Sequence, residues 1–349
     1  MSEPEVLVRV EGRVGRLTLN RPQALHALTL TMCQAMTDAL LAWRSDPAVS
    51  LVLLDHSGER GFCAGGDIRM LAESGAGNGR AARAFFFTEY RLDHLLFEYE
   101  KPVVAILDGV TMGGGVGLSL PARYRVATER TNFAMPETGI GLFPDVGGGW
   151  HLPHMPDQMG LWLALTGSRV KAADCELLGI ATHFVDSDRI AELKAAIIAD
   201  PDAIETTLKR FQGDAGSPPL AEHQDQIARI FTGDSVEGIV AALEADGSDW
   251  AKAQSAALAS KSPQTLKVTL RQMAEGARAP SFADNMRMEY RIAARVVQRH
   301  DFIEGVRAVI VDKDNKPRWE PTSLAGVTPA MLDAIFAPLP PDEEWSPLA

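Results

Sequence analysis

Short apolar segments alternate with longer amphipathic segments in the first half of the chain, and this alternation constrains the fold most. Residues 51–54 and 103–107 each form an apolar run of strand length, and they begin about 50 positions apart. A helical pattern follows Thr29 or Thr31, and a second one covers residues 81–99. Strands that alternate with helices predict an α/β core built from a repeating strand–helix unit.

The second half of the chain has a different pattern. Helical periodicity dominates after about residue 191, and the next apolar run that reads as a strand is 308–311. We therefore expect a core over residues 1–200 and a mainly helical region over 201–349. Two segments lack periodic structure: we expect a mobile loop at 73–79, which is rich in Gly and small residues, and a frayed end at 338–349, which holds four prolines.

Composition argues against several classes of function. The 349 residues carry a formal net charge of −12, which disfavours general nucleic-acid binding but still allows a few Lys and Arg residues to bind a phosphate-bearing ligand. No apolar run approaches the ~20 residues that cross a bilayer, and we see no signal or transit peptide. Cys33, Cys63 and Cys175 lie far apart, which predicts reduced thiols, no zinc site and a cytoplasmic protein.

Two glycine-rich segments each follow a short apolar segment. The first, residues 62–67, reads Phe-Cys-Ala-Gly-Gly-Asp, and the second contains the run 113–115 of three glycines. Glycines let a ligand approach the backbone, and N–H groups that begin a helix attract negative charge. A dinucleotide-binding fingerprint fails because Leu118 stands where Gly or Ala is needed. The first segment alone could be a simple turn, but together the two predict a two-donor oxyanion hole.

Three carboxylates lie in apolar surroundings. Glu137 and Asp145 are eight residues apart in the segment 133–149, which is otherwise rich in apolar residues, Gly and Pro. Such a setting raises carboxyl pKa values and suits acid–base chemistry, although either residue could instead cap a helix or turn. Glu89 falls on the apolar face of the helix over 81–99, so it is either paired in the core or lines a pocket.

These segments, in this order, resemble the crotonase superfamily, also called the enoyl-CoA hydratase/isomerase family. That family usually has Asn where this chain has His26. The resemblance implies a crotonase-like spiral of repeated ββα units, followed by a helical C-terminal region that completes the site and makes oligomer contacts. It extends to four further segments of the chain: 19–28, 261–263, 288–291 and 300–314.

The resemblance also implies roles for individual residues. The backbone N–H groups of Gly66 and Gly114 would bind the thioester oxygen of an acyl-CoA, and Glu137 would be the main catalytic carboxylate. Asp145 and Glu89 would bind the substrate or assist catalysis. The remaining contacts would come from Asp67 to the substrate and from four residues near the CoA moiety: Leu25, Ala27, Ala64 and Arg69.

One departure separates members of this family. Hydratases carry a second glutamate two residues after the three glycines, and here that position is Gly117. We expect Gly117 to lie in the first turns of a helix, where a Glu side chain would be sterically possible and would point towards the site. The absence of the second glutamate disfavours hydration, and the resemblance implies hydrolysis of a short branched 3-hydroxyacyl-CoA, most closely 3-hydroxyisobutyryl-CoA of valine degradation. The alternatives are an enoyl-CoA hydratase or isomerase, and a non-catalytic acyl-CoA-binding protein. We expect no cofactor or metal besides CoA itself, no nucleic-acid or membrane partner, and a homo-oligomer such as a trimer or hexamer.

Overall fold

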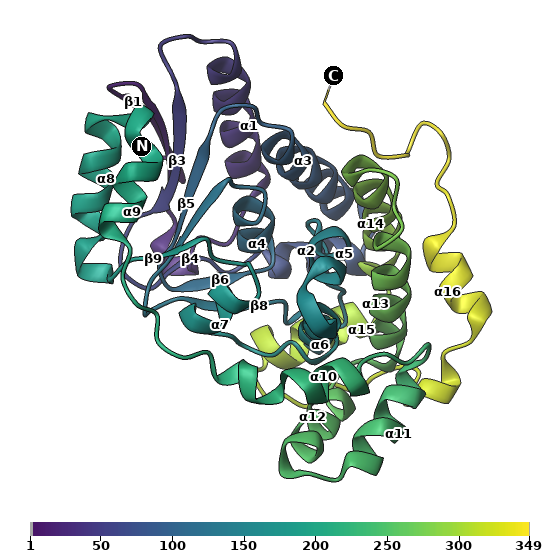
Figure 1. Ribbon diagram of the computed structural model, residues 1–349. Coiled ribbons are helices and arrows are strands. Elements are labelled where there is room, and N and C mark those ends of the chain that lie inside the picture. The colour runs from purple at the N-terminus through teal and green to yellow at the C-terminus, as the bar shows by residue number, and fades with distance from the viewer. Residues whose placement is uncertain (1–2, 349) are drawn as a thin grey trace.

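The computed structural model describes residues 3–348, which form two sheets surrounded by helices (Figure 1). The larger sheet has the order β1-β2-β3-β5-β7-β9, and the smaller has the order β4-β6-β8. All neighbouring strands are parallel except β1 and β2. The larger sheet contains β1 (Val6–Glu11), β2 (Val14–Leu19), β3 (Leu51–His56), β5 (Val103–Leu107), β7 (Tyr124–Ala127) and β9 (His183–Phe184); the smaller contains β4 (Gly61–Cys63), β6 (Val110–Met112) and β8 (Asn132–Ala134).

The strands come in consecutive pairs that repeat. β3 and β4, β5 and β6, and β7 and β8 each supply one strand to the larger sheet and the next to the smaller. The first two pairs are each followed by a helix, α2 (Ile68–Ala76) and α4 (Gly114–Ser119). This arrangement confirms the α/β fold of repeated ββα units. It also brings the ends of β4 and β6 together, because these two strands are direct neighbours.

Helices cover both faces of the larger sheet. In β3, Leu51 and Leu53 pack against α8 (Ile190–Ala199) and α9 (Ile204–Phe211), whereas Val52 and Leu54 face the opposite core. That core includes α1 (Leu30–Arg44) and α3 (Arg80–Phe97). Burial on both faces explains why the strand reads as a continuous apolar run.

The C-terminal half is helical, as expected. In Figure 1, α13 and α14 lie beside the core, and α10 to α12 lie at the end of the molecule that is farthest from α1. The elements are α5 (Gly148–His151), α6 (Met159–Thr166), α7 (Ala172–Leu177), α10 (Gln224–Ile230), α11 (Val236–Asp246), α12 (Asp249–Ala259), α13 (Pro263–Gly276), α14 (Phe282–Val296), α15 (His300–Val306) and α16 (Pro329–Phe336). The division of the chain near residue 200 stays a prediction.

Three local expectations were wrong. Most of the segment 73–79 belongs to α2 or to the turn after it, because Asp67 caps that helix by accepting from the Met70 N–H. Residues 308–311 lie in a π-helical turn, Arg307–Val311, that continues α15. The proline-rich end is packed rather than frayed, since Trp345 is 1% exposed and its indole N–H donates to the Phe87 carbonyl.

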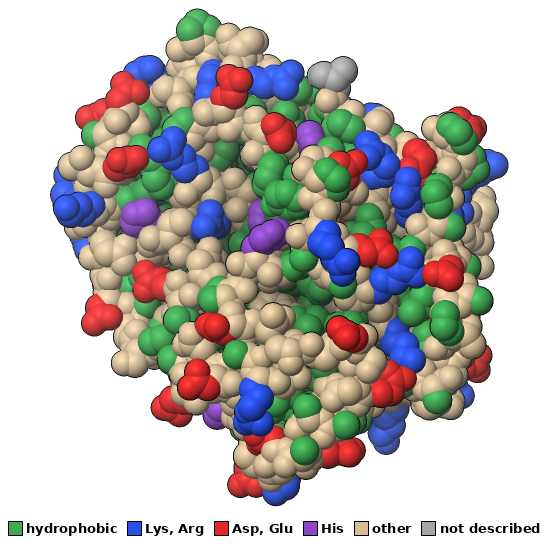
Figure 2. Space-filling model, turned by 45° about the vertical axis from the view of Figure 1, so that its right-hand side comes forward, with side chains coloured by type: hydrophobic (Ala, Val, Ile, Leu, Met, Phe, Trp, Pro, Cys, Tyr) green, Lys and Arg blue, Asp and Glu red, His purple; other side chains and the backbone are tan. Residues whose placement is uncertain are grey.

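The surface carries both signs of charge. On the face drawn in Figure 2, acidic and basic side chains are interspersed, so the net charge of −12 is not gathered there. Within residues 3–348, every helix is too short or too polar to cross a bilayer.

Candidate active site

The glycine-rich segments place two free backbone donors side by side. Gly66 follows β4, and Gly114 is the first residue of α4, which follows β6. In the part of the chain that the structure describes, neither N–H donates to another protein group. The N–H of a first helical residue has no partner within the helix, so it is available to a ligand. Two such donors at adjacent strand ends have the arrangement of an oxyanion hole.

Glycine is required here because the backbone approaches its neighbours closely. Gly65 and Gly113 adopt positive φ values of 112° and 49°. A Cβ at Gly114 would lie 2.6 Å from Oε1 of Glu89, and one at Gly113 would lie 3.2 Å from Oε1 of Glu137. Any side chain at these positions would displace a carboxylate of the site.

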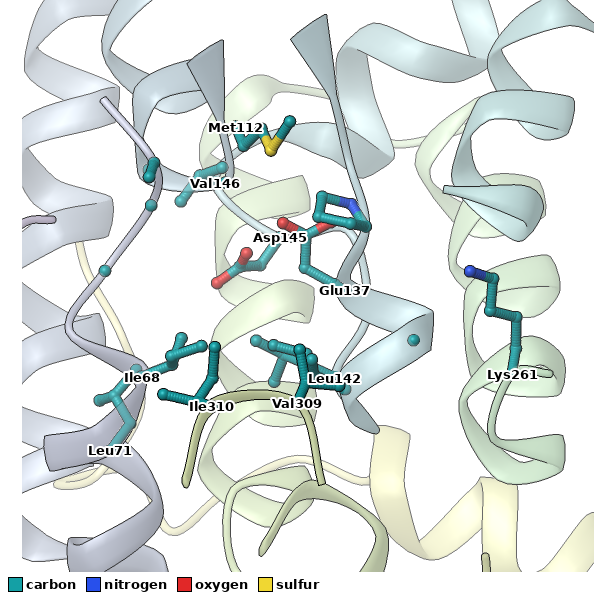
Figure 3. A pocket seen from close by; sticks show the side chains of 18 of the residues that line it. Ile68, Leu71, Met112, Glu137, Leu142, Asp145, Val146, Lys261, Val309 and Ile310 are labelled. Carbon is teal, nitrogen blue, oxygen red and sulfur yellow. The ribbon is translucent and has the colours of Figure 1, made fainter. Parts of the chain in front are cut away.

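A cavity of about 530 Å³ contains both donors and all three predicted carboxylates. Figure 3 shows the side chains of Glu137 and Asp145 next to each other in its centre, with Ile68, Leu142 and Ile310 on the apolar side below them. The cavity therefore combines an apolar wall with a small number of convergent polar groups, as ligand sites do. The apolar lining comes from Ile68, Leu71, Phe85, Phe86, Met112, Ile140, Leu142, Val146, Val309 and Ile310.

Glu137 begins a short 3-10 helix, Glu137–Ile140, immediately after β8 and Pro136. Its side chain is 5% exposed, and Oε2 has no hydrogen-bond partner among the described residues. Burial raises the pKa of the Glu137 carboxyl well above its usual value, and the nearby Asp145 raises it further. A carboxylate that is free of protein partners can accept a proton from water or attack a substrate carbonyl.

Asp145 is fixed from two sides. The Tyr90 hydroxyl donates to its Oδ2 at 2.8 Å. Glu289 on α14 accepts from the N–H groups of Gly147 and Gly149, each at 2.8 Å, and so holds the loop that carries Asp145. Burial raises the pKa of Asp145 to about 7, although the Tyr90 hydrogen bond opposes this shift. Asp145 can therefore change its protonation state near neutral pH.

Glu89 lies on α3, directly opposite Gly114, and it is 2% exposed. Its Oε1 has no hydrogen-bond partner within residues 3–348. Burial raises the pKa of Glu89 well above its usual value, with a further contribution from Asp145. Of the two readings of this residue, a core ion pair and a pocket carboxyl, the structure supports the second.

Most of the residues predicted to contact the CoA moiety or the substrate, other than the three carboxylates and the two donors, lie outside the cavity lining. Ala64 lines the cavity, but Leu25, Ala27 and Arg69 do not. The Asp67 side chain caps α2 and pairs with Arg21 at 3.0 Å. His26 is 2% exposed, and its ring accepts from the Arg21 N–H and donates to the Ser57 carbonyl. These contacts give His26 a structural role in the loop before α1, and Asp67 a structural role at the start of α2.

The sequence did not point to several residues of the site. Ser260, Lys261, Val309, Ile310 and Asn315 line the cavity from the helical half of the chain. The resemblance covered Lys261, Val309 and Ile310 but implied no role for them, and their separation from Glu137 exceeds 120 positions, so local patterns could not connect them to the site. Tyr90 could have been found, since it directly follows Glu89 on the same helix.

Gly117 has less free space than the sequence suggested. We expected that a Glu side chain at this position would be sterically tolerated and would point towards the site. That expectation was wrong: a Cβ at Gly117 would lie 2.7 Å from Cβ of Val146 and 2.8 Å from Oδ1 of Asp93. The neighbouring helix and loop therefore fill the place of a second hydratase carboxylate.

Groups of three or more His, Cys, Asp or Glu side chains placed to hold a metal ion are absent from residues 3–348. The site instead offers two backbone donors and carboxyls whose pKa values are raised by burial. This set can stabilise an oxyanion and transfer protons.

A family model described as enoyl-CoA hydratase/isomerase matches residues 14–336. The chain belongs to the enoyl-CoA hydratase/isomerase family. Within this family, it is 46% identical over 344 residues to a mitochondrial 3-hydroxyisobutyryl-CoA hydrolase of Danio rerio, covering 96% of this chain and 90% of that protein. The Homo sapiens protein of the same name is 43% identical over 344 residues, covering 96% of this chain and 89% of its own length.

Solved structures of the family agree on the fold but carry different names. A carnitinyl-CoA dehydratase from Mycobacterium thermoresistibile superposes with a TM-score of 0.94 at 43% identity, covering 99% of both chains. An enoyl-CoA hydratase from Rhodobacter sphaeroides 2.4.1 gives a TM-score of 0.91 at 38% identity, covering 98% of this chain and 100% of that one. All of these names describe enzymes that act on acyl-CoA thioesters.

The expectation of a cytoplasmic protein was wrong. The hydrolases of Danio rerio, Gallus gallus and Homo sapiens are all named as mitochondrial. The cysteines could not decide this point: all three are free and buried, and thiols stay reduced in more than one compartment.

Proposed function

We propose that this protein hydrolyses 3-hydroxyisobutyryl-CoA to 3-hydroxyisobutyrate and CoA, a step of valine degradation. The observation that carries the proposal is the pairing of two free N–H donors with Glu137 and Asp145 in one cavity, while the hydratase carboxylate position is Gly117. The curated relatives named as 3-hydroxyisobutyryl-CoA hydrolases, at 43–46% identity, support the same reaction.

The thioester oxygen binds between the N–H groups of Gly66 and Gly114. As a nucleophile adds to the carbonyl carbon, this oxygen gains negative charge, and each donor stabilises it by about 2.7–4 kcal/mol. The donors are fixed by the ends of β4 and β6 before the reaction begins, so little reorganisation is required.

Glu137 supplies the nucleophile by one of two routes. In the first, Glu137 removes a proton from water, the hydroxide oxygen bonds to the carbonyl carbon, the C–S bond breaks, and the thiolate takes the proton from Glu137. In the second, a Glu137 oxygen attacks the carbonyl carbon, CoA leaves, and water then hydrolyses the mixed anhydride. Single turnover in ¹⁸O-labelled water distinguishes the routes, because only the anhydride route can leave the label on Glu137.

Asp145 and Glu89 act on the substrate beside Glu137. Asp145, with a pKa raised to about 7, is suited to hold the 3-hydroxyl group or to position Glu137. Glu89 faces the Gly114 donor, where a neutral carboxyl favours the oxyanion. Leu25, Ala27, Ala64 and Arg69 are the proposed contacts of the CoA moiety, and Ala64 is the one of these four that lines the cavity.

The competing function is hydration of an enoyl-CoA, and the names of the two solved relatives favour it. Hydration by the two-carboxylate route needs a second acid at position 117, and Val146 and Asp93 occupy the space beside that position. The test is a comparison of thiol release from 3-hydroxyisobutyryl-CoA with loss of the crotonyl-CoA double bond. Efficient hydration without cleavage of any thioester in a panel would refute the hydrolase.

Three further features belong to the same proposal. The reaction uses no metal or cofactor besides the CoA of its substrate, so exhaustive chelation should leave the rate unchanged. The helical region over 201–349 completes the cavity through residues such as Lys261 and Ile310. The chain forms a homo-oligomer, a trimer or hexamer, and light scattering of the purified protein measures this directly.

A further inference from the structure

Glu289 accepts four hydrogen bonds in the interior of the molecule. It lies on α14, is 0% exposed and is absent from the lining of the catalytic cavity. Its Oε2 accepts from the Gly147 N–H at 2.8 Å, and its Oε1 accepts from the Gly149 N–H at 2.8 Å. Oε1 also accepts from Asn285 at 2.9 Å and from Gln272 at 3.2 Å. A carboxylate can accept from all of these donors, whereas an amide would direct its own NH2 group at one of them.

Two of these bonds hold a strained turn that begins at Asp145. Within this turn, Val146 adopts a φ of 52° and Gly147 a φ of 87°. A left-handed φ is an outlier for a β-branched residue such as Val146, and it persists only where the surroundings fix it. The bonds from Glu289 to Gly147 and Gly149 lie within three residues of Val146. They are therefore among the contacts that keep the turn in this form.

The other side of the turn is held by Gln272 on α13. Its amide donates to the Pro144 carbonyl at 2.6 Å as well as to Glu289. Asp145 thus lies between two anchored parts of the backbone, the carbonyl before it and the N–H groups after it. The fit is close, because a Cβ at Gly149 would lie 3.0 Å from both Oε1 of Glu289 and Nε2 of Gln272.

These anchors can reach the reaction through Asp145, whose side chain is the ionisable one in this turn. Within residues 3–348, the Asp145 carboxyl has one hydrogen-bond partner, the Tyr90 hydroxyl. One hydrogen bond leaves the carboxyl free to turn about it, so the backbone must set its direction. In Figure 3, the carboxyl lies next to that of Glu137.

We propose that Glu289 is a positioning residue: together with Gln272, it fixes the backbone of Asp145 so that the Asp145 carboxyl meets the substrate beside Glu137. Both anchors come from the helical half of the chain, which thereby contributes to the reaction without touching the substrate. The kinetic consequence rests on the proposed thioester hydrolysis, whereas the fixing of the turn does not. A misplacement of about 1 Å at a reaction centre can lower turnover about 10²-fold.

Hydrogen exchange tests the fixing of the turn without any substrate. Glu289→Gln keeps the shape of the side chain but can accept from only one of the two glycine N–H groups. Amides in 145–150 should therefore exchange at least about tenfold faster than in the wild type, while those of β3 keep their rate. The matched control is Asp174→Asn, because Asp174 is also buried and accepts from the Leu220 N–H outside the site. Its exchange in 145–150 should equal that of the wild type.

Two results of this measurement would overturn the proposal. Unchanged exchange in 145–150 of Glu289→Gln would show that the turn does not depend on Glu289. An equal acceleration in β3 would show a general loss of stability rather than the release of one turn.

A double-mutant cycle tests whether the effect reaches the reaction through Asp145. At a temperature where every variant is folded, Glu289→Gln should lower kcat by about tenfold or more. In the Asp145→Asn background, the same substitution should change the residual kcat by less than about threefold, because the group that it positions is gone. A purely structural role would give the same loss in both backgrounds and would contradict the proposal. If the enzyme cleaves a different thioester, the substrate panel shows it, and the exchange result still stands.

Should Glu289→Gln not fold, Gln272→Met tests the turn from its other side. Met is similar in length but cannot donate to the Pro144 carbonyl, and both glycine N–H bonds to Glu289 stay in place. Exchange in 145–150 should again become faster, and kcat should fall only while Asp145 is present. Wild-type exchange and wild-type kcat in Gln272→Met would show that the turn keeps its form without this anchor, against the proposal.

Discussion

Glu137 must lose its proton to act as a base or a nucleophile, yet its surroundings favour the protonated form. Burial and the adjacent Asp145 both raise its pKa. A general base is most effective when its pKa lies close to the working pH, so the raised pKa suits Glu137 to proton transfer. Burial of the charged carboxyl lowers the stability of the fold, but it makes the ionised form more reactive.

This argument predicts the pH dependence of the reaction. Because the pKa of Asp145 is raised to about 7 and that of Glu137 is raised as well, activity should rise with pH through the neutral range. The measurement is kcat/KM between about pH 5 and pH 9. An acid limb near the ordinary carboxyl pKa of about 4 would contradict the raised values.

The role of Glu137 itself is tested by Glu137→Gln. The amide keeps the size of the side chain but removes the base and the nucleophile, so turnover should fall by at least about 10²-fold. Since no protein group depends on Oε2 of Glu137, the melting temperature should not fall. Near-normal turnover of the folded variant would remove Glu137 from the mechanism.

At the scale of elements, α3 and α4 meet through glycines on one helix and acids on the other. This contact allows Glu89 to reach the oxyanion hole, and it leaves no room for a side chain at Gly117. Gly117→Glu should therefore lower the melting temperature and give no hydration of crotonyl-CoA. Gly238→Ala, at an exposed position on α11, is the control and should be neutral or slightly stabilising. Hydratase activity in a stable Gly117→Glu protein would contradict the packing argument.

The π-helical turn Arg307–Val311 and the residues after it form a strap across the cavity, and Arg307 fixes this strap. Its guanidinium pairs with Glu304 at 2.8 Å, Asp312 at 2.6 Å and Asp314 at 2.8 Å. Val309, Ile310 and Asn315 of the strap line the site.

Arg307→Gln should loosen the strap and raise KM more than it lowers kcat, because the strap binds the substrate but carries no reacting group. Limited proteolysis at 312–317 should also become faster. Arg229→Gln removes a comparable ion pair, with Asp246, far from the cavity and serves as the control. Equal KM values for Arg307→Gln and the wild type would show that the strap does not contribute to binding.

At the scale of the whole molecule, the sequence predicted what local patterns encode. The apolar runs at 51–54 and 103–107 marked β3 and β5, and the glycine segments and the carboxylates Glu89, Glu137 and Asp145 meet in one cavity. The strands β4, β6 and β8 have three residues each, too few for a recognisable period, so only the resemblance to a known family implied them. The helical half contributed lining residues that only tertiary packing brings to the site.

The buried acids also determine how stability depends on pH. Five carboxyls in and behind the site, those of Glu89, Asp93, Glu137, Asp145 and Glu289, have pKa values raised by burial. These five carboxyls make the folded state bind more protons than the unfolded state above about pH 4, and their contribution to the free energy of unfolding falls as pH rises. Buried histidines with lowered pKa values, such as His56 and His151, act in the opposite direction up to the ordinary histidine pKa of about 6.5, so the fall is steepest above that pH. Carboxyls with lowered pKa values, such as Asp55 and Glu304, act in the opposite direction, but they titrate below about pH 4.

The melting temperature should consequently be higher near pH 5 than near pH 8. Asp145→Asn provides the sharpest test of this effect, because Asn can still accept the Tyr90 hydrogen bond but has no proton to lose. The variant should lose turnover, yet at about pH 8 it should melt at a higher temperature than the wild type, and the difference between pH 5 and pH 8 should shrink. Calorimetry of both proteins across this range measures the effect directly. If the melting temperature of the wild type rises towards pH 8 and Asp145→Asn follows the same curve, Asp145 is ionised at little cost, and its raised pKa cannot be part of the mechanism.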